Sequence, residues 1–182
     1  IGDITAINIS DGKLIWQTPT QSSKIYREAM FLNSSDLVLK DNSIYYSNNK
    51  NEFFSIDTET GILNWIQKIN SSLRPVSINN LIFTITNEGY FVVLNNNGEI
   101  IRSTYLLKNI KEKKRKKIKF TGFVLGLKNI YLSTTTGRLF VIDASTGKLI
   151  DVLKIDNEKI SRPSIYKNNL YIAKNNSVIK LN

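Results

Sequence analysis

The 182-residue sequence contains no cysteine and no histidine. Without cysteine the chain forms no disulfide and offers no thiol nucleophile, and it is compatible with either an oxidising or a reducing compartment. Without histidine it also lacks the commonest acid–base catalyst, and the two absences together remove the usual zinc ligands. The composition therefore gives no positive support for an enzyme.

Long apolar runs are missing as well. No stretch approaches the ~18 apolar residues of a membrane-spanning helix, and residues 1–20 lack the basic start and apolar centre of a signal peptide. The sequence opens within a repeat and without methionine, so we expect it to be part of a longer protein, with any targeting segment upstream. Its 41% hydrophobic and 22% charged residues suffice for an ordinary globular core.

A strand–turn–strand unit recurs four times along the chain. Its clearest copy is NEFFSIDTETGILNW, in which apolar residues alternate on both sides of a turn that runs from Asp57 to Gly61. An aspartate in such a turn accepts backbone N–H groups, and glycine takes the positive φ of the reversal. The turn glycines of the four copies, Gly12, Gly61, Gly98 and Gly147, are separated by 49, 37 and 49 residues. A period near 40 residues built from strands is typical of β-propellers.

The sequence thus predicts an all-β fold, a β-propeller with four-stranded blades. We expect an incomplete blade at each end, residues 1–17 and 162–182, and three blades between them, residues 36–69, 74–106 and 120–154. The second of these blades is expected to have strands at 75–78, 81–86, 90–94 and 99–106, and the third at 120–125, 129–133, 138–143 and 148–153.

Two insertions, residues 18–35 and 107–119, account for the longer spacings, and both fall in a connection between blades. Insertions gathered on one face of a repeat protein often mark its binding face. The face of the repeat that carries these two segments is therefore a candidate binding face.

The patterns Asp57-x-x-Thr60-Gly61-x-x-x-Trp65 and Asp143-x-x-Thr146-Gly147-Lys148 resemble the repeat of PQQ-like (quinoprotein-type) β-propellers. In that family the tryptophan four residues after the turn glycine packs between adjacent blades. Trp16 and Trp65 fit this pattern, whereas the other two units have arginine and aspartate there. The resemblance implies a partial ring of about four blades, the C-terminal half of an eight-bladed propeller. Closure as a small four-bladed ring is the alternative, and the extra strand in residues 1–17 counts against it.

Within that superfamily, residues 2–16 (GDITAINISDGKLIW) and 162–182 (RPSIYKNNLYIAKNNSVIKLN) are most similar to the BamB family. This resemblance implies a non-enzymatic periplasmic scaffold without cofactor or metal, a lipoprotein held at the outer membrane of a Gram-negative bacterium by an upstream cysteine. Its implied partner is the central barrel subunit of the outer-membrane β-barrel assembly machinery, bound through that subunit's periplasmic domains.

The family's partner contact includes a Leu-x-Leu-Arg run just before a turn glycine, and Ile7-Asn8-Ile9-Ser10 stands at the matching position here. Serine in place of arginine removes a guanidinium that would pair with a carboxylate. The candidate partner-binding residues are Ile7, Ile9, Ser10, Arg27 and Glu28.

Most of the net charge of +10 is concentrated in residues 108–119, which hold eight basic residues and one glutamate, a net +7. Three interpretations stay open: a solvated loop without a partner, a site for anionic lipid or an acidic protein surface, and a nucleic-acid site. The lack of aromatic residues from 108 to 119 counts against nucleic acid. The candidate residues for binding an anionic surface are Lys111, Lys113, Lys114, Arg115, Lys116 and Lys117.

The repeated residues are interpreted as structural, because groups that recur once per blade are dispersed and do not converge on one catalytic centre. They are Gly12, Trp16, Asp57, Gly61, Trp65, Gly98, Asp143 and Gly147. Two alternative functions remain, a quinone-dependent dehydrogenase-like propeller and a propeller that binds lipid or polysaccharide through the basic segment. We also expect self-association, or a missing N-terminal half, to complete the ring.

Overall fold

The computed structural model describes residues 3–20 and 32–181. The chain divides into two compact units, Ile1–Pro75 and Val76–Asn182. The described residues of both units form antiparallel β-structure, with one short helix, α2 (Glu112–Arg115), in the second unit. The candidates Arg27 and Glu28 lie outside the described residues.

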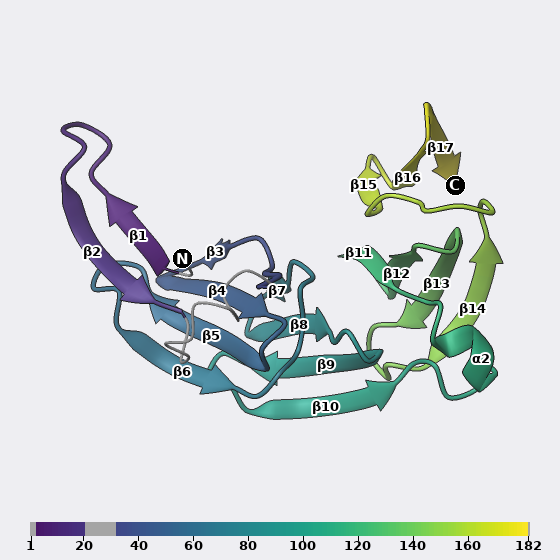
Figure 1. The fold of residues 1–182 in the computed structure, drawn as a ribbon, viewed down its shortest axis with the longest axis horizontal. Helices are drawn as coiled ribbons and strands as arrows, with labels where there is room; N and C mark the ends of the chain where they lie inside the picture. Colours follow the sequence, from purple (N-terminus) through teal and green to yellow (C-terminus); the bar gives the residue numbers. More distant parts are fainter. Residues whose placement is uncertain (1–2, 21–31, 182) are drawn as a thin grey trace. The chain divides into compact units, whose positions relative to one another are not determined.

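The first unit contains a hairpin and a four-stranded sheet (Figure 1). The hairpin pairs β1 (Asp3–Ile7) with β2 (Leu14–Pro19). Sequence neighbours pair throughout the sheet, in the order β3-β4-β5-β6. Its strands are β3 (Val38–Lys40), β4 (Ser43–Asn48), β5 (Glu52–Asp57) and β6 (Leu63–Gln67).

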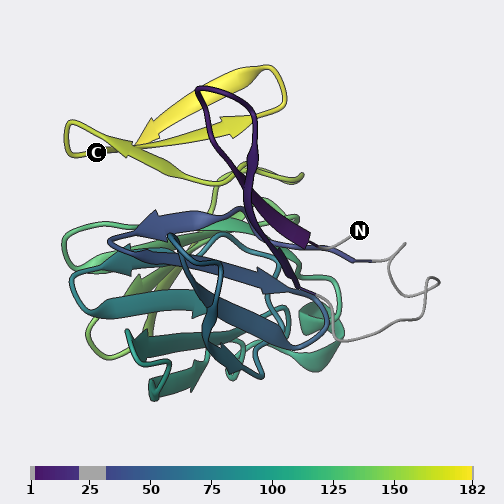
Figure 2. The same cartoon turned by 90° about the vertical axis from the view of Figure 1, so that its left-hand side faces the viewer.

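The second unit contains three sheets built in the same way. The first has strands β7 (Val76–Ile78), β8 (Leu81–Ile85), β9 (Tyr90–Asn95) and β10 (Ile100–Tyr105). The second has β11 (Phe120–Leu125), β12 (Asn129–Thr134), β13 (Arg138–Asp143) and β14 (Leu149–Lys154). The third is the small three-stranded meander drawn in yellow in Figure 2, with β15 (Ser164–Tyr166), β16 (Asn169–Lys174) and β17 (Ser177–Leu181).

The middle strands of each four-stranded sheet carry the core. Phe53 on β5, Phe91 on β9 and Phe140 on β13 are fully buried, whereas the fourth strands β6, β10 and β14 are largely exposed. Trp65 on β6 covers part of the first core, with its ring 5.7 Å from that of Phe53 and 6.1 Å from that of Tyr45. On β9 four consecutive apolar residues, 91–94, are buried, so both faces of this strand are covered.

The observed strands lie close to those expected from the sequence. From β7 to β14 no strand end differs from its expected position by more than one residue, and β11 and β13 have the expected bounds. The division of the chain into blades at the stated residues stays a prediction. Of the two expected insertions, residues 107–119 lie between β10 and β11 and contain α2, while most of 18–35 lies outside the described residues.

Candidate protein-binding and anion-binding sites

The turn of the β1–β2 hairpin is organised by the side chain of Asn8. The Asn8 Oδ1 accepts the Ser10 N–H at 2.9 Å and the Ser10 hydroxyl at 2.6 Å. The backbone carbonyl of Asn8 accepts the Gly12 N–H at 2.8 Å. Gly12 has φ of +71°, which L-residues rarely adopt. These bonds hold the reversal in one conformation. They leave Ile9 fully exposed and Ile7 60% exposed.

Ile9 is a large apolar side chain at a place where the fold does not need one. It stands three residues before its turn glycine, and the same position is held by Thr58 after β5 and by Ala144 after β13. Leu14 on β2, which is 61% exposed, is the register partner of Ile7 and extends the apolar surface of the hairpin beside it. Contiguous exposed apolar groups of this kind are typical of protein-contact surfaces. The structure therefore places Leu14, which the sequence reasoning did not single out, beside the predicted contact residue Ile7.

The turn aspartates are engaged within their own turns. Asp57 Oδ1 accepts the N–H and the hydroxyl of Thr60, both at 2.8 Å. Asp143 Oδ1 accepts the Ser145 hydroxyl at 2.7 Å and the N–H and hydroxyl of Thr146 at 2.7 and 2.8 Å. The Thr60 hydroxyl and N–H lower the pKa of Asp57. The Ser145 hydroxyl, followed by the two Thr146 groups, lowers the pKa of Asp143 to about 2. Both carboxylates are ionised acceptors that stabilise a turn.

The β1–β2 hairpin packs onto the turn that follows β5. Trp16 Nε1–H donates to the Thr58 carbonyl at 3.0 Å, and the Thr18 hydroxyl donates to the Gly61 carbonyl at 2.5 Å. A Cβ on Gly61, where φ is +71°, would lie 2.6 Å from Trp16 Cδ2. The glycine thus serves both the turn and the close approach of the indole.

The second unit repeats this contact without a tryptophan. A Cβ on Gly147 would lie 2.8 Å from Thr104 Oγ1 and 2.9 Å from Phe91 Cδ1. Thr104 stands six residues after Gly98, the same relation that Thr18 has to its own turn glycine. A threonine on the last strand of one sheet, β2 or β10, therefore meets the turn glycine of the next sheet in both units.

In the basic segment, residues 108–119, the guanidinium of Arg115 binds to neighbouring groups of the same segment and to Tyr105. Its Nε–H donates to the Ile110 carbonyl, its Nη2–H donates to the Lys108 carbonyl at 2.8 Å, and its guanidinium lies 5.8 Å from the ring centroid of Tyr105. Lys116 Nζ lies 3.4 Å from Glu112 Oε1 across one exposed turn. Arg115 thus holds the segment in place, which the sequence alone did not distinguish from charge offered to a ligand.

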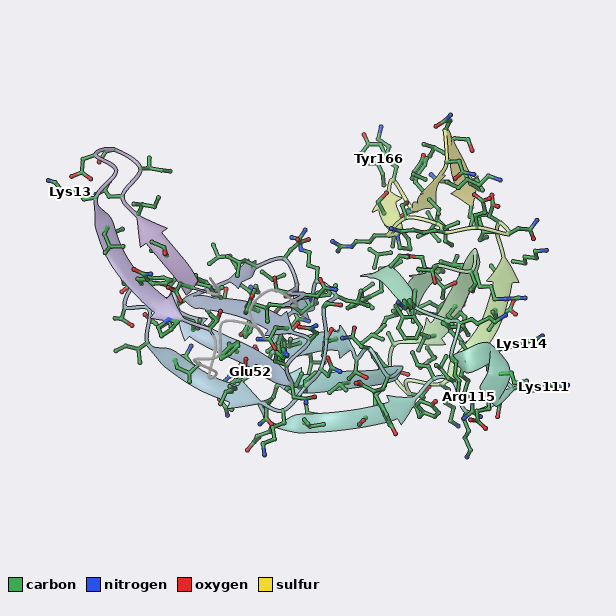
Figure 3. The ribbon with its side chains drawn as sticks, viewed as in Figure 1. Lys13, Glu52, Lys111, Lys114, Arg115 and Tyr166 are labelled. Atoms are coloured by element: carbon green, nitrogen blue, oxygen red, sulfur yellow. The ribbon has the colours of Figure 1, made fainter. Side chains whose placement is uncertain are left out.

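Three lysines of residues 108–119, Lys111, Lys114 and Lys117, line a hollow of about 600 Å³ in the second unit. Figure 3 shows Lys111, Lys114 and Arg115 around α2. The lining residues are Asn109, Ile110, Lys111, Lys114, Lys117, Ile118, Thr136, Arg138, Val152, Lys154, Asp156 and Asn157, and we call this site the basic hollow. Arg138 and Lys154 were missed by the sequence reasoning, because they lie on strands far from the charge run.

Among the described residues no group of three or more aspartates and glutamates is arranged to hold a metal ion. Glu52, labelled in Figure 3, is buried on β5, where Asn48 Nδ2–H donates to its Oε2 at 2.8 Å. No described helix is long and apolar enough to cross a membrane.

Residues 1–104, more than half of the chain, match the family model described as outer membrane protein assembly factor BamB. The chain belongs to the BamB family. BamB of Legionella pneumophila (strain Paris) is 23% identical over 183 residues, which cover 98% of this chain and 45% of that protein.

Solved structures agree on the fold. The crystal structure of BamB from Moraxella catarrhalis has a TM-score of 0.72 at 14% identity, over 98% of this chain and 51% of that one. The β-propeller domain of Cps50 (Swd1) from Myceliophteria thermophila has a TM-score of 0.66 at 15% identity, over 93% and 55%. The expected PQQ-like β-propeller fold is thereby confirmed. The chain spans about half the length of the BamB proteins it matches.

Proposed function

We propose that this chain is part of a non-enzymatic scaffold subunit of the outer-membrane β-barrel assembly machinery, located in the periplasm at the outer membrane. Membership of the BamB family supports the assembly role. In this proposal the β1–β2 turn contacts the periplasmic domains of the central barrel subunit. The observation that carries the contact is the apolar tip, where Ile9 is fully exposed and Ile7 60% exposed on a turn held by Asn8.

A rigid apolar tip is suited to protein recognition. Burying an isoleucine side chain contributes about 1.5–3 kcal/mol, and a turn that is already ordered loses little further entropy on binding. Ser10 provides no cation, and the nearby Lys13 and Asp11 form an exposed ion pair at 3.1 Å. In this proposal most of the binding free energy of the contact comes from burying apolar side chains. Arg27 and Glu28 remain additional candidates from the sequence.

A pull-down from a Gram-negative envelope extract tests this function, with the full-length protein that contains this chain as bait. Wild type is expected to capture the barrel subunit, and Ile7→Asp/Ile9→Asp to lose it, because two carboxylates would be buried without partners. Leu127→Asp is the matched control, since Leu127 is also fully exposed but follows β11. Equal capture by wild type and the double variant would exclude this turn as the contact. Capture of no envelope protein by either would refute the scaffold function.

A further inference from the structure

The basic hollow gathers five cations from three separate segments of the second unit. Lys111, Lys114 and Lys117 come from the segment around α2, Arg138 from the start of β13 and Lys154 from the end of β14. We propose that this hollow binds a ligand with clustered phosphate groups, which is either a phosphorylated lipid headgroup or a soluble diphosphate compound.

The three lysines share one face of the segment. The Lys114 N–H donates to the Lys111 carbonyl at 2.8 Å, and the Lys117 N–H donates to the Lys114 carbonyl at 3.2 Å. Residues three apart on such turns lie on the same side. Lys113 and Lys116, between them in sequence, do not line the hollow. The turns of the backbone therefore place some lysines of residues 108–119 in the lining of the hollow and leave the others outside it.

The two strand residues place like charges opposite each other. Arg138 and Lys154 are register partners in the β13–β14 pair. Like charges directly opposite across a sheet are destabilising. Among residues 3–20 and 32–181, neither of them nor any of the three lysines forms an ion pair. An anion bound between these side chains would relieve that repulsion.

The single carboxylate in the lining is already paired elsewhere. Asp156 Oδ2 lies 2.7 Å from Lys174 Nζ, and Asp156 Oδ1 accepts the Asn157 N–H at 2.6 Å. The Asp156 backbone is fixed as well, because its N–H donates to the Gly137 carbonyl at 3.0 Å. A Cβ on Gly137 would lie only 2.2 Å from the Asp156 carbonyl oxygen, so this wall requires glycine. Asp156 thus forms part of the wall of the hollow, while its carboxylate pairs with Lys174 and not with the five cations of the lining.

The remaining lining residues fit a phosphate ligand. Ile110, Ile118 and Val152 make part of the wall apolar, and charges attract more strongly beside protein of low dielectric constant than in bulk water. Lysine supplies compact charge and arginine a planar fork of donors, both common partners of phosphate. Five cations exceed the charge of about −2 that one phosphate carries. The hollow therefore matches a ligand with two or more neighbouring phosphates.

Two hollow variants and one control test the proposal in the full-length protein. Lys114→Gln/Lys117→Gln removes two cations from the segment, and Arg138→Gln/Lys154→Gln removes the two strand cations. Lys113→Gln/Lys116→Gln removes the same charge from the same segment outside the hollow. One arm titrates inorganic pyrophosphate by calorimetry. The other measures co-sedimentation with vesicles of phosphatidylcholine and cardiolipin, whose headgroup carries two phosphates, with pure phosphatidylcholine vesicles for comparison.

Each hollow variant is expected to weaken binding roughly 30-fold, while the control stays within about twofold. Pyrophosphate binding with this pattern assigns a soluble ligand. Binding with this pattern to the cardiolipin vesicles, without pyrophosphate binding, assigns a lipid headgroup. Equal losses of binding in the hollow and control variants would mean that the ligand responds to the overall charge of the segment, and would overturn the proposal. Absence of binding in both arms would overturn it as well.

Discussion

At the scale of single residues, the turn glycines Gly12 and Gly61 share a backbone conformation but differ in surroundings. Both have φ of +71°, yet a Cβ on Gly12 would meet nothing within 4 Å, whereas one on Gly61 would meet Trp16 at 2.6 Å. The pair separates the cost of a left-handed backbone from the cost of a close contact.

We expect Gly12→Ala to cost about 1–2 kcal/mol in the free energy of unfolding, from backbone strain alone. Gly61→Ala should cost about 1–3 kcal/mol more, because its methyl group displaces the indole of Trp16. Urea unfolding followed by tryptophan fluorescence measures both values. Equal losses in the two variants would show that the Trp16 contact adds nothing.

The turn aspartate Asp143 makes one turn sensitive to acid. Its pKa of about 2 in the fold lies below the ordinary value of 3.8, mainly because of the Ser145 hydroxyl. Its stabilisation is therefore present above about pH 4 and is lost as the pH falls towards 2. We expect the Thr146 amide resonance to titrate in this range. Asp143→Asn should keep the turn and abolish the titration, since Asn8 already makes an equivalent turn. A titration with the ordinary aspartate midpoint would contradict this explanation.

At the scale of elements, the pairing of the third and fourth strands of every four-stranded sheet contains a register shift, and so does the hairpin. The shifts lie at Ala6/Ile7, Ser55/Ile56, Ile100/Arg102 and Val141/Ile142. Such bulges increase the local twist of a strand pair. The repeat therefore extends to backbone irregularities, which the sequence reasoning did not detect because the bulged residues have ordinary side chains.

The α2 segment depends on one side chain, and this leads to a third prediction. Arg115→Ala removes two hydrogen bonds to the carbonyls of Lys108 and Ile110 and a contact with Tyr105. Amide hydrogen exchange of residues 108–118 should become at least about tenfold faster, because hydrogen bonds to charged groups contribute about 1.5–3 kcal/mol. The control Lys113→Ala, at an exposed position, should leave exchange unchanged. Equal exchange in Arg115→Ala and wild type would show that other contacts hold the segment.

At the scale of the whole molecule, the sheets differ in how many strands they have. The three larger sheets have four strands each, whereas the described residues of the last sheet form three and the hairpin has two. Within the described residues β17 pairs only with β16. An open strand edge is a template for pairing with another chain. The completion of a ring by a second copy or by an N-terminal half remains a prediction.

The isolated 182-residue chain is accordingly expected to self-associate, and the full-length protein to be monomeric under the same conditions. Light scattering after size-exclusion chromatography measures both masses. A stable, monodisperse species of 20.8 kDa for the isolated chain would contradict the prediction.

The fold class, the approximate strand positions and the turns of this protein can be predicted from its sequence alone. These features follow from local rules: alternation of apolar residues sets the strands, and Asp57 or Asp143 with a glycine four residues later sets the turns. The repeat of about 40 residues then predicts the propeller, because one such unit cannot bury its apolar faces alone.

Which charged and apolar side chains are available to a partner could not be predicted from the sequence, because it depends on tertiary contacts. In the structure Arg115 donates a hydrogen bond to the Lys108 carbonyl. Arg138 and Lys154 line the same hollow as lysines more than 20 residues away in the sequence. Ile9 is fully exposed in the structure, whereas the sequence offered it as a contact residue only through a resemblance. The physical reason is that exposure and charge pairing depend on contacts between distant segments, which no local pattern encodes.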